Sequence, residues 1–212
     1  MIPAEVKSPE GACAVASSEM EFDSDSVLIR RHLGGDRRAF EVLFKRYQTP
    51  VFNLCSRIVG GEDAHDLTQD VFCNVLRALH RFRGEAKFST WLFSIAKNVC
   101  LNRLRHDAVI REESLDEMFE EKPASDGLPD LSADVERIAE THEVQRIVGS
   151  VLATLPPEQR MLIALRDFEQ LSYEEIGRIA DMSVSNVKSR LHRARMAFKD
   201  RFKPYLKLLR EG

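Results

Sequence analysis

Apolar residues recur at three- and four-residue steps along most of the chain, which is the pattern of amphipathic helices. No segment shows the strict two-residue alternation of a half-buried strand. The sequence therefore predicts an all-α protein. We also expect Pro50 to interrupt or kink a helix, because proline lacks a backbone donor and clashes with the preceding turn. The apolar positions around that proline are Phe40, Leu43, Phe44, Tyr47, Val51 and Leu54.

Changes in composition divide the 212 residues into four segments. Residues 1–25 show little periodicity and are rich in Ala, Ser, Glu and Pro, which predicts a disordered N-terminal tail. Residues 26–106 and residues 136–206 predict two small helical domains. Residues 107–135 combine proline and glycine with many acids, so we expect a flexible acidic linker that lets the two domains rearrange.

A helix-turn-helix is predicted within the second domain. Ser172 and Glu175 have the spacing of a capping box, which marks the start of a helix. Gly177 is small enough to let the next helix approach closely, and Asp181 stands in a tight turn. Ser183 can then cap a second helix, which we expect to extend to about Arg201 and to be the recognition helix.

The predicted recognition helix has one apolar face and one polar, basic face. Its apolar residues fall on one stripe when they are placed 100 degrees apart, and they are Val187, Leu191, Ala194, Phe198 and Phe202. Such a helix suits the major groove of DNA, although an ordinary amphipathic helix with a solvated face remains the alternative. The positions that we expect to contact DNA are Ser185, Asn186, Lys188, Ser189, Arg190, His192, Arg193, Arg195 and Lys199.

The net charge of −3 conceals an uneven distribution. Between residues 77 and 105 only Glu85 opposes a series of basic residues, and between residues 188 and 210 only Asp200 does so. The segment between these two basic blocks is strongly acidic. Two basic blocks indicate two contacts with one polyanion.

Other features narrow the class of protein. No apolar run approaches the roughly 18 residues of a membrane-spanning helix, and the N-terminus lacks the pattern of a secretory signal. We therefore expect no membrane insertion and a place of work in the cytoplasm. None of the four cysteines forms a C-x-x-C pair. Cys55, Cys73 and Cys100 lie among apolar residues and are expected to be buried free thiols, with a metal or redox role as the minor alternative, whereas Cys13 lies in the predicted tail. No metal or other cofactor is predicted. The four are Cys13, Cys55, Cys73 and Cys100.

The motifs occur in an order that resembles a known family. They are DAHDLTQDVF at 63–72, FSTWLFSIAKN at 88–98, LPPEQR at 155–160, LSYEEI at 171–176 and VKSRLHRAR at 187–195. Over Asp36–His106 and Leu155–Phe202 the chain resembles bacterial RNA polymerase sigma-70 factors of the extracytoplasmic-function (ECF) group. The resemblance implies that residues 26–106 are sigma region 2 and that residues 136–206 are sigma region 4.

The resemblance also implies roles for individual residues in region 2. One helix would meet the β′ clamp helices of core RNA polymerase, and its residues are Asp63, Asp66, Leu67, Gln69, Asp70 and Phe72. A following segment would read and melt the −10 element, and cations interleaved with aromatic rings suit single-stranded DNA. Phe88 fits base stacking and core packing equally, whereas Trp91 is expected in the core. The residues of this segment are Arg81, Phe82, Arg83, Lys87, Phe88, Thr90, Trp91, Lys97, Asn98 and Arg103.

Some positions depart from the family pattern. Asp181 stands where glycine is frequent, and Ser185 and Asn186 stand where Gly-Thr is frequent. Asn102 replaces a frequent aspartate. Aspartate and asparagine tolerate turn conformations, so the fold is not affected. The bases read at the −35 element, however, cannot be transferred from relatives.

The sequence thus predicts a sigma factor for transcription initiation, without catalytic residues of its own. The resemblance adds the polymerase β flap as a contact of region 4 and an anti-sigma factor as a partner. A conventional helix-turn-helix regulator that acts without polymerase is the alternative. An enzyme is a third hypothesis, because His65 and Asp66 resemble the central dipeptide of metal-dependent phosphohydrolases, but the other histidines supply no companion motif.

Overall fold

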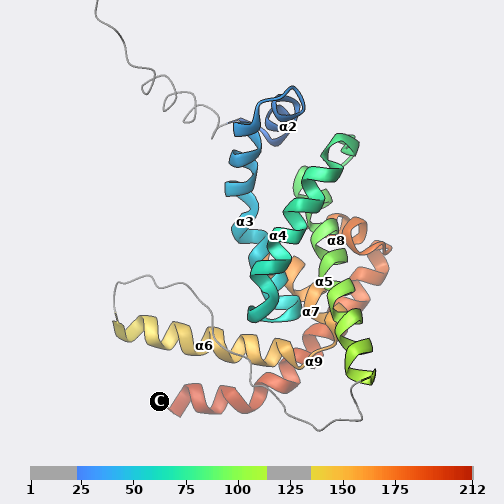
Figure 1. The fold of residues 1–212 in the computed structure, drawn as a ribbon. Coiled ribbons are helices and arrows are strands. Elements are labelled where there is room, and N and C mark those ends of the chain that lie inside the picture. Colours follow the sequence, from blue (N-terminus) through green and yellow to red (C-terminus); the bar gives the residue numbers. More distant parts are fainter. Residues whose placement is uncertain (1–22, 114–134, 212) are drawn as a thin grey trace, which may run out of the picture.

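The computed structural model describes residues 23–113 and 135–211, and every regular element within these two ranges is a helix (Figure 1). The predicted all-α class is therefore confirmed. The first range holds α2 (Asp25–Leu33), α3 (Arg37–Val59), α4 (Gly61–Ala78), the short 3₁₀ helix η1 (Leu79–Arg81) and α5 (Phe88–Glu113). The second holds α6 (Val135–Ala153), α7 (Pro157–Ile163), the π-helical turn η2 (Ala164–Phe168), α8 (Tyr173–Ala180) and α9 (Val184–Glu211).

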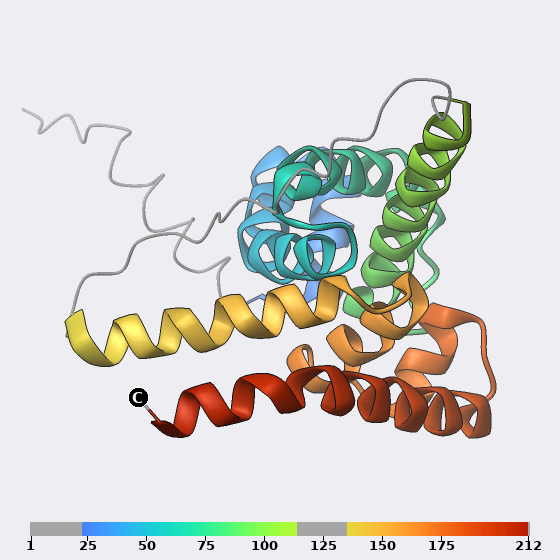
Figure 2. The same ribbon diagram turned by 90° about the horizontal axis from the view of Figure 1, so that it is seen from below.

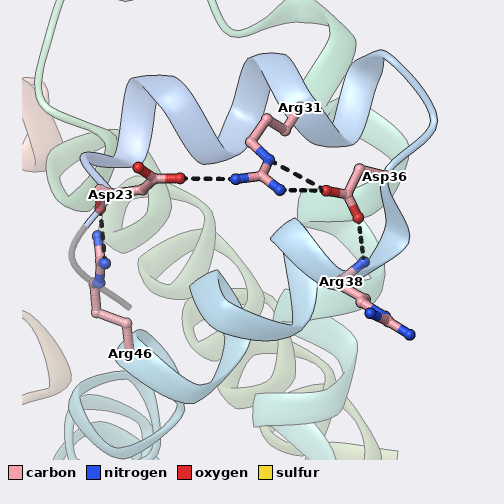
Figure 3. Close-up of polar contacts among 5 residues, drawn as sticks. All are labelled: Asp23, Arg31, Asp36, Arg38 and Arg46. Carbon is pink, nitrogen blue, oxygen red and sulfur yellow. Dashed lines mark hydrogen bonds and ion pairs between the residues drawn. The ribbon is translucent and has the colours of Figure 1, made fainter. Parts of the chain in front are cut away.

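Ion pairs fasten the start of the described chain to the first long helix (Figure 3). The guanidinium of Arg31 lies 3.1 Å from a carboxylate oxygen of Asp23 and 3.0 Å from one of Asp36. Arg46 donates to the Asp25 carboxylate at 2.6 Å and to the Asp23 carbonyl at 2.9 Å. Residues 23–25 are thus part of the folded domain, and the predicted tail boundary at residue 25 is wrong at its last residues. Residues 1–22 lie outside the described part.

Helix α3 is continuous through Pro50. Beyond the proline its apolar face is fully buried, and Val51, Leu54 and Ile58 are all 0% exposed. Packing on this face holds the helix together despite the missing backbone donor. Pro50 therefore does not interrupt the helix, and a kink at this position stays a prediction.

Helices α4 and α5 pack on α3 and complete the first core. Helix α5 continues to Glu113, beyond the expected end of the domain at residue 106. The remainder of the predicted linker, residues 114–134, lies outside the described residues. Helix α6 begins at Val135, within one residue of the predicted start.

In the second range, α7 and α8 pack on α9, and η2 packs on α7 and α8. The C-terminal half of α9 runs beside α6, away from the rest of the molecule, and reaches Glu211 rather than the expected residue 206 (Figure 2). The two helical units also contact each other, because α5 packs on α8 and α3 packs on α6 and α7. The sequence did not predict this packing between the domains.

Candidate DNA and polymerase interfaces

The helix-turn-helix begins with a complete capping box. The backbone N–H of Ser172 donates to Glu175 Oε2 at 2.8 Å, and the N–H of Glu175 donates to Ser172 Oγ at 3.1 Å. Helix α8 ends at Asp181, whose φ of 55° and ψ of 52° lie in the left-handed region. Aspartate is one of the few residues besides glycine that tolerate this conformation. The predicted cap and the predicted turn are both confirmed.

Gly177 allows the turn to close onto α8. A Cβ atom at this position would lie 2.7 Å from the carbonyl oxygen of Met182, closer than real Cβ atoms come to other atoms. The Met182 N–H donates to the Gly177 carbonyl at 2.9 Å, so the backbones are in direct contact. The close neighbour of Gly177 is thus the turn rather than the next helix that the sequence predicted; from that helix, Val187 Cγ2 would lie 4.0 Å from the added Cβ.

Helix α9 presents the face that the sequence predicts. Val187, Leu191 and Ala194 are at most 1% exposed and anchor it to the core. Ser183 Oγ accepts from the Asn186 N–H at 3.3 Å, which caps the helix. All nine predicted DNA-contacting residues are exposed: Ser185, Asn186, Lys188, Ser189, Arg190, His192, Arg193, Arg195 and Lys199. Their contact with DNA stays a prediction.

Acidic side chains from other elements hold two of these cations in place. Arg190 Nη1 donates to Glu158 Oε2 of α7 at 2.8 Å. Arg195 donates two hydrogen bonds to the carboxylate of Asp167 in η2, and these bonds raise the pKa of its guanidinium. The sequence did not indicate either pair, because each joins residues about thirty positions apart.

In the first domain, the predicted −10 segment contributes Phe82, Phe88 and Trp91 to an aromatic cluster that also contains Tyr47 of α3. The Phe88 ring centroid lies 5.4 to 5.8 Å from the centroids of the other three rings. Phe88 is 3% exposed and Thr90 is 2% exposed, so both belong to the core. Of the two interpretations of Phe88, the structure favours core packing, and neither side chain is offered to DNA as placed here. Trp91 is half-buried against the core.

The remaining residues of the segment differ in their surroundings. Arg81, Arg83, Lys87 and Asn98 are exposed, whereas Phe82 and Lys97 are half-buried. Arg103 is held 3.0 Å from Asp63 of α4 and 3.0 Å from Asp107 of its own helix, and these acids raise the pKa of Arg103. The structure thus pairs Asp63, which the sequence assigned to the polymerase interface, with Arg103, which it assigned to the −10 DNA. Arg103 is already neutralised within the protein.

Helix α4 presents an acidic face formed by Asp66, Gln69 and Asp70, all exposed. Leu67 and Phe72, which the sequence placed in the same interface, are each 4% exposed. The Phe72 ring packs 4.6 Å from the ring of Phe44. As placed here, Leu67 and Phe72 support the helix rather than contribute to its outer surface.

Other chemistry finds little support in the described part of the chain. There, no three His, Cys, Asp or Glu side chains gather in a manner that would hold a metal ion. His65 is exposed, and its ring centroid lies 4.5 Å from that of Phe52 with the two ring planes tilted by 40°. Cys55, Cys73 and Cys100 are free thiols. Cys55 and Cys100 are buried in the core between α3 and α5, whereas Cys73 is exposed, so the expectation of a buried Cys73 is wrong. None of the described helices has the length and apolar character required to cross a membrane.

Comparison with known families accounts for both halves of the chain. Residues 43–109 match the model of sigma-70 region 2, and residues 145–198 match that of sigma-70 region 4. A chain with these two regions in this order is of the sigma-70 class. The helical fold and the helix-turn-helix agree with this class.

Individual relatives show to which group of the sigma-70 family the chain belongs. It is 37% identical to the ECF RNA polymerase sigma-E factor of Escherichia coli K12 over 185 residues, which are 87% of this chain and 97% of that protein. The corresponding factor of Haemophilus influenzae is 35% identical over 86% of this chain and 97% of its own length. The chain therefore belongs to the ECF group of the sigma-70 family.

Two solved structures share the fold. CnrH, in complex with the cytosolic domain of CnrY, has a TM-score of 0.62 at 24% identity, covering 86% of this chain and 99% of that chain. The sigma factor RpoE of Bartonella quintana, in complex with the anti-sigma factor NepR, has a TM-score of 0.62 at 22% identity, covering 77% and 96%.

Proposed function

We propose that this sigma factor docks on core RNA polymerase and directs initiation by reading the −35 element with region 4 and reading and melting the −10 element with region 2. The observation that carries the proposal is the capped helix-turn-helix, whose recognition helix exposes nine polar or basic residues, on a chain that also contains region 2. In this role the polymerase forms the bonds, so the sigma factor would need no catalytic group or cofactor of its own. Its place of work is then the cytoplasm.

Region 4 would place the N-terminal half of α9 in the major groove of the −35 duplex. Ser185, Asn186 and Ser189 lie in its first two turns and would face base edges, and asparagine can form two hydrogen bonds with adenine. Arg193 and Lys199 would meet phosphates. Because Arg190 and Arg195 are held by acids, they would contact DNA in a fixed orientation.

Region 2 would hold the separated −10 strand along its exposed cations. Arg81, Arg83 and Lys87 are exposed and neighbour Phe82 and Phe88 in the sequence, and they would meet the phosphates of the strand. The partly exposed rings of Phe82 and Trp91 offer stacking surfaces at the edge of the cluster. Phe88 and Thr90 would support this surface from below.

The acidic face of α4 would meet a basic surface of the polymerase, which the family resemblance identifies with the β′ clamp helices, and region 4 would contact the β flap. An anti-sigma factor is a further proposed partner. Support for it comes from the structural relatives, since CnrH was solved with a domain of CnrY and RpoE with the anti-sigma factor NepR.

Co-migration with core RNA polymerase on size-exclusion chromatography tests the docking step. The wild-type protein should elute with the polymerase, and the charge reversals Asp66→Lys and Asp70→Lys should abolish this. Glu41→Lys reverses an exposed acid on α3 and should leave co-migration intact, which makes it the matched control. A wild-type protein that binds promoter DNA alone and never elutes with polymerase would favour the conventional regulator.

A further inference from the structure

The first residue of α2 holds the hydroxyl group of a tyrosine on α3. Tyr47 Oη donates to Asp25 Oδ2 at 2.5 Å, and Arg46 Nη1 donates to Asp25 Oδ1 at 2.6 Å. Arg46 also donates to the Asp23 carbonyl at 2.9 Å (Figure 3). A bond of this length between a hydroxyl and a carboxylate is charge-assisted and strong. The start of the described chain therefore fixes the polar end of the Tyr47 side chain.

Tyr47 remains a hydrogen-bond donor at neutral pH. Burial raises the pKa of its hydroxyl above the ordinary value, and the hydrogen bond and the negative charge of Asp25 raise it further. The positive charge of Arg46 opposes this with a smaller effect. The phenol therefore keeps its proton, and the Asp25 carboxylate can accept it in a hydrogen bond.

The ring of the same tyrosine supports the aromatic cluster. Its centroid lies 5.4 Å from that of Phe88 with the ring planes at 69°, which is an edge-to-face contact. Phe88 in turn lies 5.7 Å from Phe82 and 5.8 Å from Trp91. Phe82 and Trp91 are the two half-buried rings that the proposed function offers to the −10 strand. Buried Phe88 thus connects Tyr47 to both of these outer rings.

The two ends of the −10 loop also meet at this cluster. Residues 82–87 lie between η1 and α5 and form no regular element, and Gly84 within them has a φ of 74°. Phe82 begins this loop and Phe88 follows it as the first residue of α5, and their rings pack edge to face. The position of Phe88 therefore affects both the loop, which carries Arg83 and Lys87, and the helix that follows.

We propose that Asp25 is a positioning residue for the −10 element: by holding the Tyr47 hydroxyl, it fixes the ring that supports Phe88 and, through Phe88, the loop and rings that meet the separated strand. The inference rests on the proposed function, since such positioning matters for the promoter only if this surface meets the −10 strand. Without the hydrogen bond, the cluster spends a smaller fraction of time in the binding arrangement, and the apparent affinity falls with that fraction.

The positioning can be measured without polymerase or DNA, because Trp91 is the only tryptophan of the chain. Asp25→Ala and Tyr47→Phe should each increase the quenching of Trp91 fluorescence by acrylamide. Asp23→Ala is the matched control, because it removes a nearby acid that pairs with Arg31 rather than with Tyr47. Circular dichroism confirms that each variant is folded. Tyr47→Phe keeps the aromatic ring, so it tests the hydrogen bond even if Asp25→Ala does not fold.

The same variants test the role at the promoter. The probe is a fluorescein-labelled single strand with the −10 sequence of a promoter identified by transcript sequencing, bound by the full-length protein with core polymerase. Asp25→Ala and Tyr47→Phe should each weaken binding by about three- to tenfold, in line with the coupling of residues in contact. The double variant should lose no more than the weaker of the two, because both changes remove the same hydrogen bond.

Two further variants separate positioning from a general loss of structure. Asn has polar groups that can bind both the Tyr47 hydroxyl and Arg46, so Asp25→Asn should recover most of the wild-type affinity. Asp23→Ala should bind the probe as the wild type does. Co-migration with polymerase should be unchanged in every variant, since the acidic face of α4 is not altered.

Three results would overturn the positioning role of Asp25. They are losses of affinity that add in the double variant, an equal loss in Asp23→Ala, and Trp91 quenching that stays at the wild-type value in both single variants. If the wild-type protein does not bind polymerase, the proposed function fails and the role at the −10 element fails with it. The Trp91 measurement would still show whether Asp25 holds the aromatic cluster, so the two failures can be distinguished.

Discussion

Arg103 of α5 and Asp63 of α4 form an ion pair with a separation of 3.0 Å, although they stand forty residues apart in the chain. The pair joins the helix that carries the proposed −10 surface to the helix that carries the proposed polymerase surface. Arg103 is therefore a link between two elements of region 2, and its charge is already balanced.

Arg103→Ala should affect stability more than promoter melting. Both partners are more than one-third exposed, so the loss in unfolding free energy should be at most about 1 kcal/mol, as for other surface pairs. Arg83→Ala should show the opposite behaviour, with unchanged stability and weaker opening of the −10 element. Urea denaturation and permanganate footprinting measure the two effects. If Arg103→Ala and Arg83→Ala lost promoter opening equally, Arg103 would be a DNA-contacting residue, as the sequence predicted.

Gly177→Ala should destabilise region 4 by about 1–3 kcal/mol, because the added methyl group would overlap the Met182 carbonyl. Gly149→Ala is the matched control, since its Cβ would meet nothing within 4 Å on helix α6. That variant should be neutral or up to about 1 kcal/mol more stable. Thermal unfolding followed by circular dichroism distinguishes them, and equal melting temperatures would contradict the proposed close approach.

The left-handed conformation of Asp181 predicts a selective response to substitution. Asp181→Gly should retain the stability of the wild type to within about 1 kcal/mol, because glycine adopts this conformation readily. Asp181→Val should lose about 1–2 kcal/mol, because its branched Cβ clashes in the left-handed region. Urea denaturation gives the comparison. Valine and glycine variants of equal stability would show that the turn adopts another conformation in solution.

Asn186 and Lys199 should affect −35 binding in different ways. Asn186→Ala should reduce discrimination between −35 sequences by about 1–3 kcal/mol if its amide reads a base. Lys199→Ala should weaken binding to all sequences and reduce the slope of log affinity against log salt by about 0.9. Fluorescence anisotropy of polymerase-bound protein at several salt concentrations measures both. Arg201→Ala, two residues further along and about 200 degrees around the helix from Lys199, is expected to change neither.

The pKa of Glu175 reports on the contact between the domains. Its hydrogen bond with Lys87, followed by the one with the Ser172 backbone, holds this pKa below its ordinary value of 4.5. The stabilisation from this carboxylate is therefore complete above 4.5 and is lost as the pH falls through the lower folded value. In a carbon-detected NMR titration, Lys87→Met should raise the Glu175 pKa, and Lys45→Met should not. An unchanged value in Lys87→Met would contradict the contact.

Local signals were sufficient to predict the helix-turn-helix. The capping box at Ser172, the turn at Asp181 and the apolar stripe from Val187 depend on residues close in sequence, and the structure contains all of them. The same holds for the all-α class. A recognition helix of this kind can therefore be predicted from the spacing and the type of its residues alone.

The burial of aromatic rings and the long-range ion pairs depend on tertiary packing, so the sequence did not predict them. Phe88 and Phe72 stand in motifs with exposed neighbours, and only the position of other helices shows that their rings are buried. Arg57 pairs with Glu169, Arg103 with Asp63 as well as with its neighbour Asp107, and Arg195 with Asp167, so each arginine has a partner far away along the chain. Contacts of this kind depend on how helices meet, which hydrophobic periodicity does not determine.

Run-off transcription with purified core RNA polymerase tests the central claim most directly. Sequencing of transcripts after overexpression would first supply a promoter. Addition of the wild-type protein should then produce a transcript from that promoter alone, and Arg193→Ala should reduce it while Arg201→Ala does not. A polymerase that starts no specific transcript in the presence of the wild-type protein would contradict its assignment as a promoter-directing sigma factor.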